Sequence, residues 1–336
     1  MTRSLLRIIL ACIAMPLLSI PAHAGLFRAY VSSTGNDANA CTLQAPCRLL
    51  PAALAAISDG GEIWMLDSAN YNTAPVNIAK SVSILAIPGA VGSVLAINGN
   101  AIDIATAGVK IALRNLVIVP FPGGNGTNGV NMTNGASLTV EGCLIANLPQ
   151  SGIVVNIPAS VRVTDTTIRD NGGTGLLLGN GAHATGAWST FSGNLGDGVA
   201  ANGTSALAAT TVDIADSTIN GNGYGIVALS GAANAVAKAS VRHSQIAGNT
   251  NYGVTAQSTS GAACTISVGD NIISNNGAGI GALYTNSKIW ASGNIISDNN
   301  YGLYTDNAGI IESAGTNAVR NNASNKTGTI NVIATE

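Results

Sequence analysis

Charged and aromatic residues are scarce in this chain of 336 residues, at 9% and 4% of the total. Residues 1–24 contain two arginines and no acid, so the remainder carries 12 basic and 16 acidic residues, a net charge of −4. Such a balance offers no electrostatic attraction for nucleic acid or anionic membranes, and we expect neither as a partner. With 46% apolar residues and so few aromatics, the composition predicts one long aliphatic core.

Long apolar runs are also missing, apart from one near the start. Residues 8–20 form an apolar run that follows Arg3 and Arg7 and precedes the small-residue segment 22–24. This order predicts a signal peptide over residues 1–24 and secretion to the periplasm or the extracellular space. The run is too short to span a membrane, and Gly, Asn and Ser interrupt every later aliphatic stretch, so no membrane span is expected.

Cysteine is rare as well, with five in the chain. No Cys-x-x-Cys or paired histidine spacing is present, so the sequence does not indicate a zinc site. Cys41 and Cys47 lie six residues apart in an exported protein, and this spacing predicts a small disulfide-closed loop. Cys143 and Cys264 are expected to be buried as small apolar residues.

The chain has instead a recurring unit of an apolar residue, an Asn three positions later, and a Gly with a branched aliphatic residue three or four positions after that. The unit recurs about every 23 residues, and such a period is typical of a solenoid in which each turn buries its apolar side on its neighbours. The Asn members are Asn171, Asn194, Asn222, Asn249, Asn276 and Asn299.

Each period predicts three short strands. Residues 160–164 and 266–268 alternate apolar and polar, a second strand carries the apolar residue before the Asn, and a third begins at the Gly. Three strands in 23–28 residues leave no room for a helix of ordinary length, and no six-residue period indicates a left-handed solenoid. We therefore expect an all-β fold, a right-handed parallel β-helix with three strands per coil.

Two parts of the chain resemble the pectate-lyase-like superfamily of right-handed β-helix proteins. One is the run of Ile-x-x-Asn-x-x-x-Gly-Ile coils over residues 129–322; the other is the stretch 30–37, followed by Cys47-Arg48 and the Ala-rich segment 52–57. The superfamily includes lyases, hydrolases, epimerases and proteins without known catalysis, so the resemblance implies the fold and leaves the activity open. The organisation that it implies is a signal peptide over 1–24, an entry strand and short capping helix over 25–60, the β-helix over 61–322 and a C-terminal end segment over 323–336.

The Asn column has a physical reason. Asn tolerates the left-handed backbone conformation of a tight corner, and its amide both donates and accepts hydrogen bonds. Stacked amides can therefore form a ladder that satisfies backbone groups at the corner, while the Gly lets the chain re-enter the next strand without steric cost. We interpret these Asn and Gly residues as structural.

Charge concentrates in one outward-facing strip of the predicted coils. When the coils are aligned on the apolar residue before the Asn, Val161 and Val163 and their equivalents face the core and the residues between them face outward. Asp216 and His243 should then lie one coil apart, about 5 Å, close enough to share a proton or a cation. Alternatively, the corner aspartates accept backbone hydrogen bonds and the arginines form ordinary surface pairs.

In the lyases that this chain resembles, substrate lies across the corresponding sheet, carboxylates there hold calcium, and a Lys or Arg removes the proton next to a uronate carboxyl. Tryptophans in the strip could stack on sugar faces. The resemblance implies as catalytic candidates Arg242, His243 and Asp216; as substrate-binding candidates Arg162, Asp165, Trp188 and Trp290; and as calcium ligands Asp213, Asp216 and Asp270.

Two functions remain open at this point. One is an exported protein that binds or processes an acidic polysaccharide, with calcium as the candidate cofactor. The other is a noncatalytic surface or matrix solenoid of the adhesin type. The motifs typical of polygalacturonases, alginate epimerases and classical pectate lyases are absent, and no long loops are evident over the strip, so the sequence does not indicate catalysis.

Overall fold

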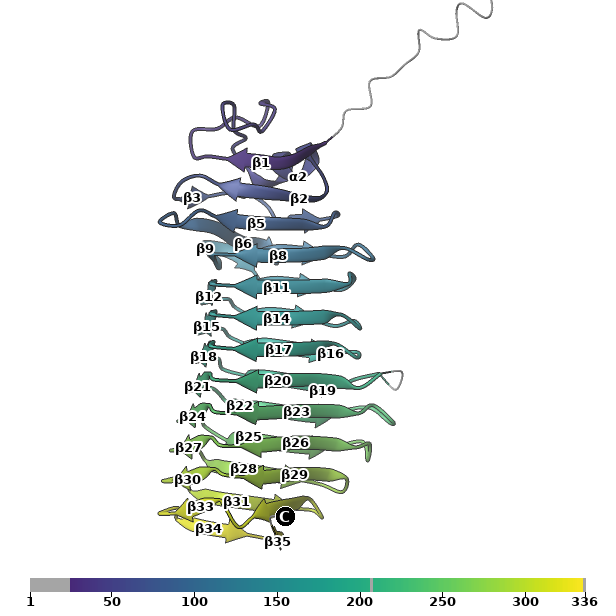
Figure 1. The fold of residues 1–336 in the computed structure, drawn as a ribbon, viewed down its shortest axis with the longest axis vertical. Coiled ribbons are helices and arrows are strands. Elements are labelled where there is room, and N and C mark those ends of the chain that lie inside the picture. Colours follow the sequence, from purple (N-terminus) through teal and green to yellow (C-terminus); the bar gives the residue numbers. More distant parts are fainter. Residues whose placement is uncertain (1–24, 206–207, 335–336) are drawn as a thin grey trace, which may run out of the picture.

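The computed structural model describes residues 25–205 and 208–334, which form a right-handed parallel β-helix (Figure 1). Three parallel sheets run along the stack: sheet A with 13 strands, and sheets B and C with 11 strands each. The predicted all-β fold with three strands per coil is confirmed. The predicted signal peptide, residues 1–24, lies outside the described residues. Among those described, no helix has the length and apolarity needed to cross a bilayer.

From β2 to β34, the strands follow one another in the order sheet A, sheet B, sheet C, and β1 and β35 are further strands of sheet A at the two ends. Sheet A contains β1 (Leu26–Val31), β2 (Ile57–Met65), β5 (Val82–Ala86), β8 (Lys110–Arg114), β11 (Ser137–Glu141), β14 (Ser160–Thr164), β17 (His183–Ala187), β20 (Thr210–Ala215), β23 (Ala237–Arg242), β26 (Cys264–Gly269), β29 (Ser287–Ser292), β32 (Ile310–Ala314) and β35 (Ile330–Ile333). Sheet B contains β3 (Ala69–Asn70), β6 (Gly92–Gly99), β9 (Leu116–Gly126), β12 (Leu144–Ala146), β15 (Thr167–Arg169), β18 (Thr190–Ser192), β21 (Thr218–Asn220), β24 (Gln245–Ala247), β27 (Ile272–Ser274), β30 (Ile295–Ser297) and β33 (Ala318–Arg320). Sheet C contains β4 (Val76–Ile78), β7 (Ile102–Ile104), β10 (Val130–Met132), β13 (Ile153–Val155), β16 (Leu176–Gly179), β19 (Asp197–Gly203), β22 (Tyr224–Ser230), β25 (Tyr252–Ser258), β28 (Ala278–Leu283), β31 (Tyr301–Asp306) and β34 (Ser324–Thr327).

The β-helix extends beyond residues 61–322 at both ends. β1 pairs with β2 in sheet A, and its buried Ala29 and Val31 continue the inward column of the sheet. At the other end, β35 pairs with β32 through Ile311 and Ile330, and β34 pairs with β31. β34 has no apolar residue and β35 is mostly exposed, so backbone pairing with the neighbouring coil holds these two strands on the stack.

The N-terminal end carries the predicted capping helix, α2 (Leu50–Ala56), whose Leu50, Ala53 and Leu54 are buried against the first coils. The Lys80 ammonium donates to the carbonyl oxygens of Leu54 and Ile57 at 3.1 and 2.7 Å, and so satisfies carbonyl groups at the end of the helix. A helix in this position covers a strand edge that would otherwise be free to pair with another chain.

The cysteines occupy two kinds of environment. Cys41 and Cys47 form a disulfide in the loop before α2, with their Cα atoms 4.6 Å apart. Cys143 and Cys264 are buried, and this burial raises the pKa of the Cys143 thiol to about 11 and that of Cys264 to about 12. Both thiols therefore stay protonated and unreactive at neutral pH.

The Asn column forms a buried ladder at the corner between sheets B and C. Each amide nitrogen donates to the side-chain oxygen of the next Asn at 2.8–3.0 Å, and the same oxygen accepts from the backbone N–H one coil before it. Most members also donate to a strand carbonyl, as Asn222 does to Phe191 at 3.0 Å. The column contains Asn171, Asn194, Asn222, Asn249, Asn276 and Asn299.

The left-handed conformation, however, belongs to the residue before each ladder Asn. Positive φ angles occur at Asp170, Gly193 and Gly221, whereas the ladder residues that follow them do not adopt this conformation. Our expectation that the ladder Asn itself is left-handed was therefore wrong. Close packing explains the Gly of the repeat: a Cβ on Gly175 would lie 2.6 Å from the carbonyl oxygen of Gly198.

Candidate functional site

Sheet A places the predicted strip on its outer face, because side chains alternate along each strand. Val161 and Val163 are buried, and Arg162 between them is exposed. The parallel register then carries this pattern from coil to coil without a shift, pairing Asp213 with Ser240 and Ala215 with Arg242. The row that begins at Arg162 continues through Thr185, Asp213, Ser240, Ser267 and Trp290.

A column of left-handed residues follows the ends of these strands. Asp165, Trp188, Asp216, His243 and Asp270 have φ angles of 48, 50, 49, 48 and 56°. Asp and Asn tolerate this conformation, but it is unfavourable for a bulky side chain. Trp188 is also 64% exposed, so the strain is not offset by burial of the ring. A strained, exposed Trp at one corner of the stack points to a functional role.

A second buried ladder, which the sequence analysis missed, holds this corner. The left-handed residues of this column are followed by Thr, Ser or Asn. The side-chain oxygen of each of these residues accepts a hydrogen bond from the backbone N–H of the equivalent residue one coil earlier, at 3.0–3.2 Å. A polar residue at the same place in successive coils was the signal that would have revealed it. Its buried members are Thr166, Ser189, Ser217, Ser244, Asn271 and Asn294, and the half-buried Asn317 ends it.

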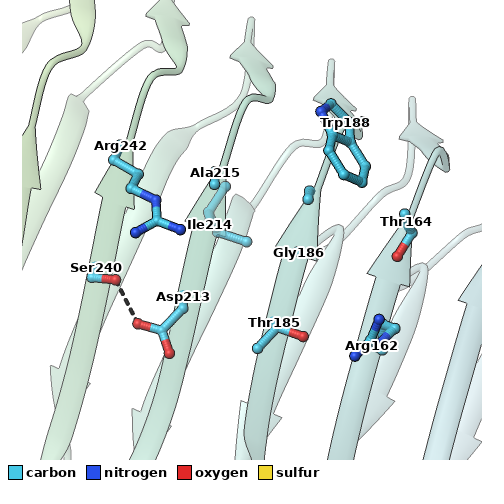
Figure 2. Close-up of a pocket in the computed structure, with 11 residues that line it drawn as sticks. Arg162, Thr164, Thr185, Gly186, Trp188, Asp213, Ile214, Ala215, Ser240 and Arg242 are labelled. Carbon is cyan, nitrogen blue, oxygen red and sulfur yellow. Dashed lines mark hydrogen bonds between the residues drawn. The ribbon is translucent and has the colours of Figure 1, made fainter.

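The strip is hollowed at two places, which together we name the sheet A groove. The first hollow, of about 540 Å³, has Arg162, Trp188, Asp213 and Arg242 among its lining residues. In Figure 2, Arg162 and Arg242 flank it on opposite sides, with Thr185 and Asp213 between them. The second hollow, of about 390 Å³, shares Ser240 and Arg242 with the first and includes Asp270, Trp290 and the small residues Gly269 and Ser292.

The two arginines of the groove differ from three others in the described residues. Arg28, Arg114 and Arg169 each form an ion pair with a carboxylate. Within residues 25–205 and 208–334, neither Arg162 nor Arg242 has an acidic partner, and both side chains are exposed. Their guanidinium groups are therefore available to bind an anionic group.

The acidic residues near the arginines are only partly engaged. Ser240 donates a hydrogen bond to Asp213 across adjacent strands. Asp165 lies in the left-handed column at the end of β14 but lines neither hollow. In the second hollow, the side chain of Trp290 is 39% exposed. The ammonium nitrogen of Lys288 lies 5.3 Å from the centre of its ring, and Lys288 also forms an ion pair with Glu312.

His243 lies between two carboxylates of the left-handed column. Its Nδ1 is 3.8 Å from Asp216 Oδ1, and its Nε2 is 3.9 Å from Asp270 Oδ2. These distances are too long for hydrogen bonds but suit electrostatic attraction when the imidazole is protonated. All three side chains are exposed, which permits contact with a ligand but weakens their mutual attraction.

The three aspartates predicted as calcium ligands are not grouped around one point. Asp216 and Asp270 are two coils apart, and His243 lies between them. Asp213 points outward from its strand and accepts a hydrogen bond from Ser240. Across the described part of the chain, no group of three or more His, Cys, Asp or Glu side chains is arranged to hold a metal ion. Calcium takes six to eight oxygen ligands, so these carboxylates would hold it only together with further oxygens from water or a bound ligand.

Comparisons with known proteins agree with this architecture. Residues 92–238 match the family model described as a right handed beta helix region. No curated protein matches the chain. The crystal structure of pectate lyase Pel9A is 16% identical with a TM-score of 0.58, covering 88% of this chain and 79% of its own.

Two further solved structures are similar to the chain over most of its length. The A-module of the mannuronan C-5 epimerase AlgE4 from Azotobacter vinelandii is 13% identical with a TM-score of 0.51, covering 82% of this chain and 86% of its own. XylC in complex with xylose is 10% identical with a TM-score of 0.52, covering 83% and 70%. Identities this low show the fold and not the activity. The chain is a right-handed parallel β-helix protein with the pectate-lyase-like fold.

Proposed function

We propose that the protein is exported and binds an anionic polysaccharide along the sheet A groove. The observation that carries the proposal is the first hollow, where two arginines without acidic partners flank an exposed, strained Trp188. An indole ring offers a flat apolar face to a sugar ring, and a guanidinium binds a carboxylate or sulfate in a fixed geometry.

We expect the arginines of the groove, and not a metal ion, to neutralise the negative charge of the ligand. Because Asp213, Asp216 and Asp270 do not form a cation site, an anionic polymer would be neutralised by Arg162 and Arg242 directly. Binding is therefore expected to persist in EDTA and to weaken as salt concentration rises, because salt screens exposed charges. The carbohydrate-active proteins that share this fold are in keeping with a saccharide ligand.

The test is binding of purified protein to a panel of uronate, sulfated and neutral polysaccharides, followed by Trp188→Asn. Because Asn tolerates the left-handed conformation, this variant should gain about 1 kcal/mol of stability while losing at least about tenfold in affinity. Leu195→Asn, which removes an exposed apolar side chain from the same coil away from the groove, is the matched control and should keep full affinity. Unchanged affinity in Trp188→Asn, or no binding to any polymer, would contradict the proposal.

A second candidate function, proton transfer on a bound uronate, is favoured by the position of His243 beside Asp216 and next to Arg242. An elimination reaction would release an unsaturated uronate, detected by its ultraviolet absorbance, and this product should disappear in Arg242→Ala and His243→Ala. Binding without product formation would identify the protein as a noncatalytic saccharide-binding solenoid.

A further inference from the structure

The two hollows of the sheet A groove meet at Arg242, with one tryptophan on each side of it. Trp188 follows β17 and Trp290 lies on β29, while Arg242 ends β23. The order of strands in sheet A is β17, β20, β23, β26, β29, so Arg242 is two strands from each tryptophan. Four strand spacings of about 4.8 Å place the two tryptophan positions roughly 19 Å apart along the stack.

Arg242 separates the hollows because it is the one long side chain in a row of short ones. That row runs through Ala187, Ala215, Arg242, Gly269 and Ser292, which pair directly across sheet A. Ala187 and Ala215 line the first hollow, and Gly269 and Ser292 line the second. Arg242 and Ser240 line both.

Each hollow contains the same three kinds of group. The first has Trp188, the carboxylate of Asp213 and the shared Arg242; the second has Trp290, the carboxylate of Asp270 and the same Arg242. A tryptophan supplies a face for a sugar ring, and a carboxylate accepts hydrogen bonds from sugar hydroxyls. The unpaired guanidinium supplies the positive charge midway between them.

We propose that the groove consists of two saccharide subsites joined at Arg242, which binds an anionic group in the middle of the ligand while sugars on either side stack on Trp188 and Trp290. This inference rests on the proposed function and adds the length and charge position of the ligand. Two linked subsites raise affinity once a ligand is long enough to reach both, because the second contact becomes intramolecular. Arg242 is then a residue that determines specificity for charge, and the two tryptophans determine the minimum length.

Matched substitutions can close one hollow at a time. Ala215→Leu would fill the floor of the first hollow. Gly269→Leu would fill the second, and it is sterically permitted, since a Cβ on Gly269 would come no closer than 3.9 Å to the nearest atom of Ser292. Ala112→Leu places the same side chain on the outer face of β8, two strands from Arg162 and outside both hollows, and serves as the control.

The experiment measures affinity by calorimetry for oligosaccharides of increasing length, taken from the anionic polymer that binds best. For the unaltered protein we expect a step of roughly tenfold or more once the oligosaccharide spans both tryptophans. Gly269→Leu should abolish the step and leave short oligosaccharides bound as before through the first hollow, and Ala112→Leu should retain the full profile. Ala215→Leu should weaken the binding of short oligosaccharides. Arg242→Gln should lower the preference for charged over neutral chains, and Arg162 remains as the cation of the first hollow.

The outcomes separate the two proposals. Affinity that rises smoothly with length, or a Gly269→Leu variant that keeps the step, overturns the two-subsite arrangement while leaving the proposed function intact. An Arg242→Gln variant whose preference for charged chains is unchanged overturns the role of Arg242. If the unaltered protein binds no oligosaccharide of any length, the proposed function is wrong and this inference is wrong with it.

Discussion

Asp197 begins β19 on sheet C, away from the sheet A groove, and its carboxyl group is partly buried. Burial raises its pKa to about 6, although a hydrogen bond donated by Thr174 at 3.4 Å opposes this effect. A raised pKa means that the folded state holds the proton more tightly than the unfolded chain. The carboxyl group therefore costs no stability at low pH, and the cost grows as pH rises from about 4 to 6 and then stays constant.

Asp197→Asn should accordingly stabilise the protein at pH 8 by about 1–3 kcal/mol and change its stability little at pH 4. Urea unfolding at the two pH values provides the measurement. Asp298→Asn replaces an exposed carboxylate in a left-handed corner, where Asn is also tolerated, and should show no such gain at pH 8. An equal effect of Asp197→Asn at both pH values would show that burial of the charge is not the cause.

At the level of elements, the Asn ladder is what joins successive corners between sheets B and C. Asn222 accepts from the backbone N–H and the amide of Asn194, and it donates to Asn249 at 3.0 Å and to Phe191. Asn222→Ala would leave these buried donors and acceptors without partners, which should cost about 1–3 kcal/mol. Chemical denaturation should show this loss, whereas Asn220→Ala, two residues earlier and exposed, should be nearly neutral. A neutral result for Asn222→Ala would mean that the ladder does not stabilise the stack.

For the whole molecule, stability depends on how the N-terminal end of the stack is covered. Removing residues 25–60 would delete β1 and α2 and expose the edge of the remaining part of β2, whose backbone groups can then pair with another chain. We expect the truncated protein to aggregate, as measured by size-exclusion chromatography with light scattering. Replacing Cys41 and Cys47 with Ala keeps the helix and should give a soluble protein that is about 2 kcal/mol less stable. A monodisperse, folded protein lacking residues 25–60 would show that this end needs no cover.

The one-dimensional repeat explains why so much of this fold could be predicted. In a solenoid, residues one period apart become direct neighbours, so alignment of the coils predicted that Asp216 and His243 would be adjacent and that Val212 and Ile214 would face the core. The buried Asn column and the outward strip on sheet A follow from the same spacing. Local patterning was therefore sufficient for the architecture and for the place of the candidate site.

Other features depend on how side chains from several coils meet in space. The left-handed residue is the one before each ladder Asn, because the ladder amide must point into the core while its neighbour turns the chain. The three aspartates do not gather around a cation, because His243 occupies the coil between two of them. Sequence spacing by itself determined the coils, their register and the columns of residues. Only the tertiary structure decided that short side chains at Ala215 and Gly269 leave hollows on either side of Arg242, because the space above a strand depends on the size of its neighbours in the adjacent coils.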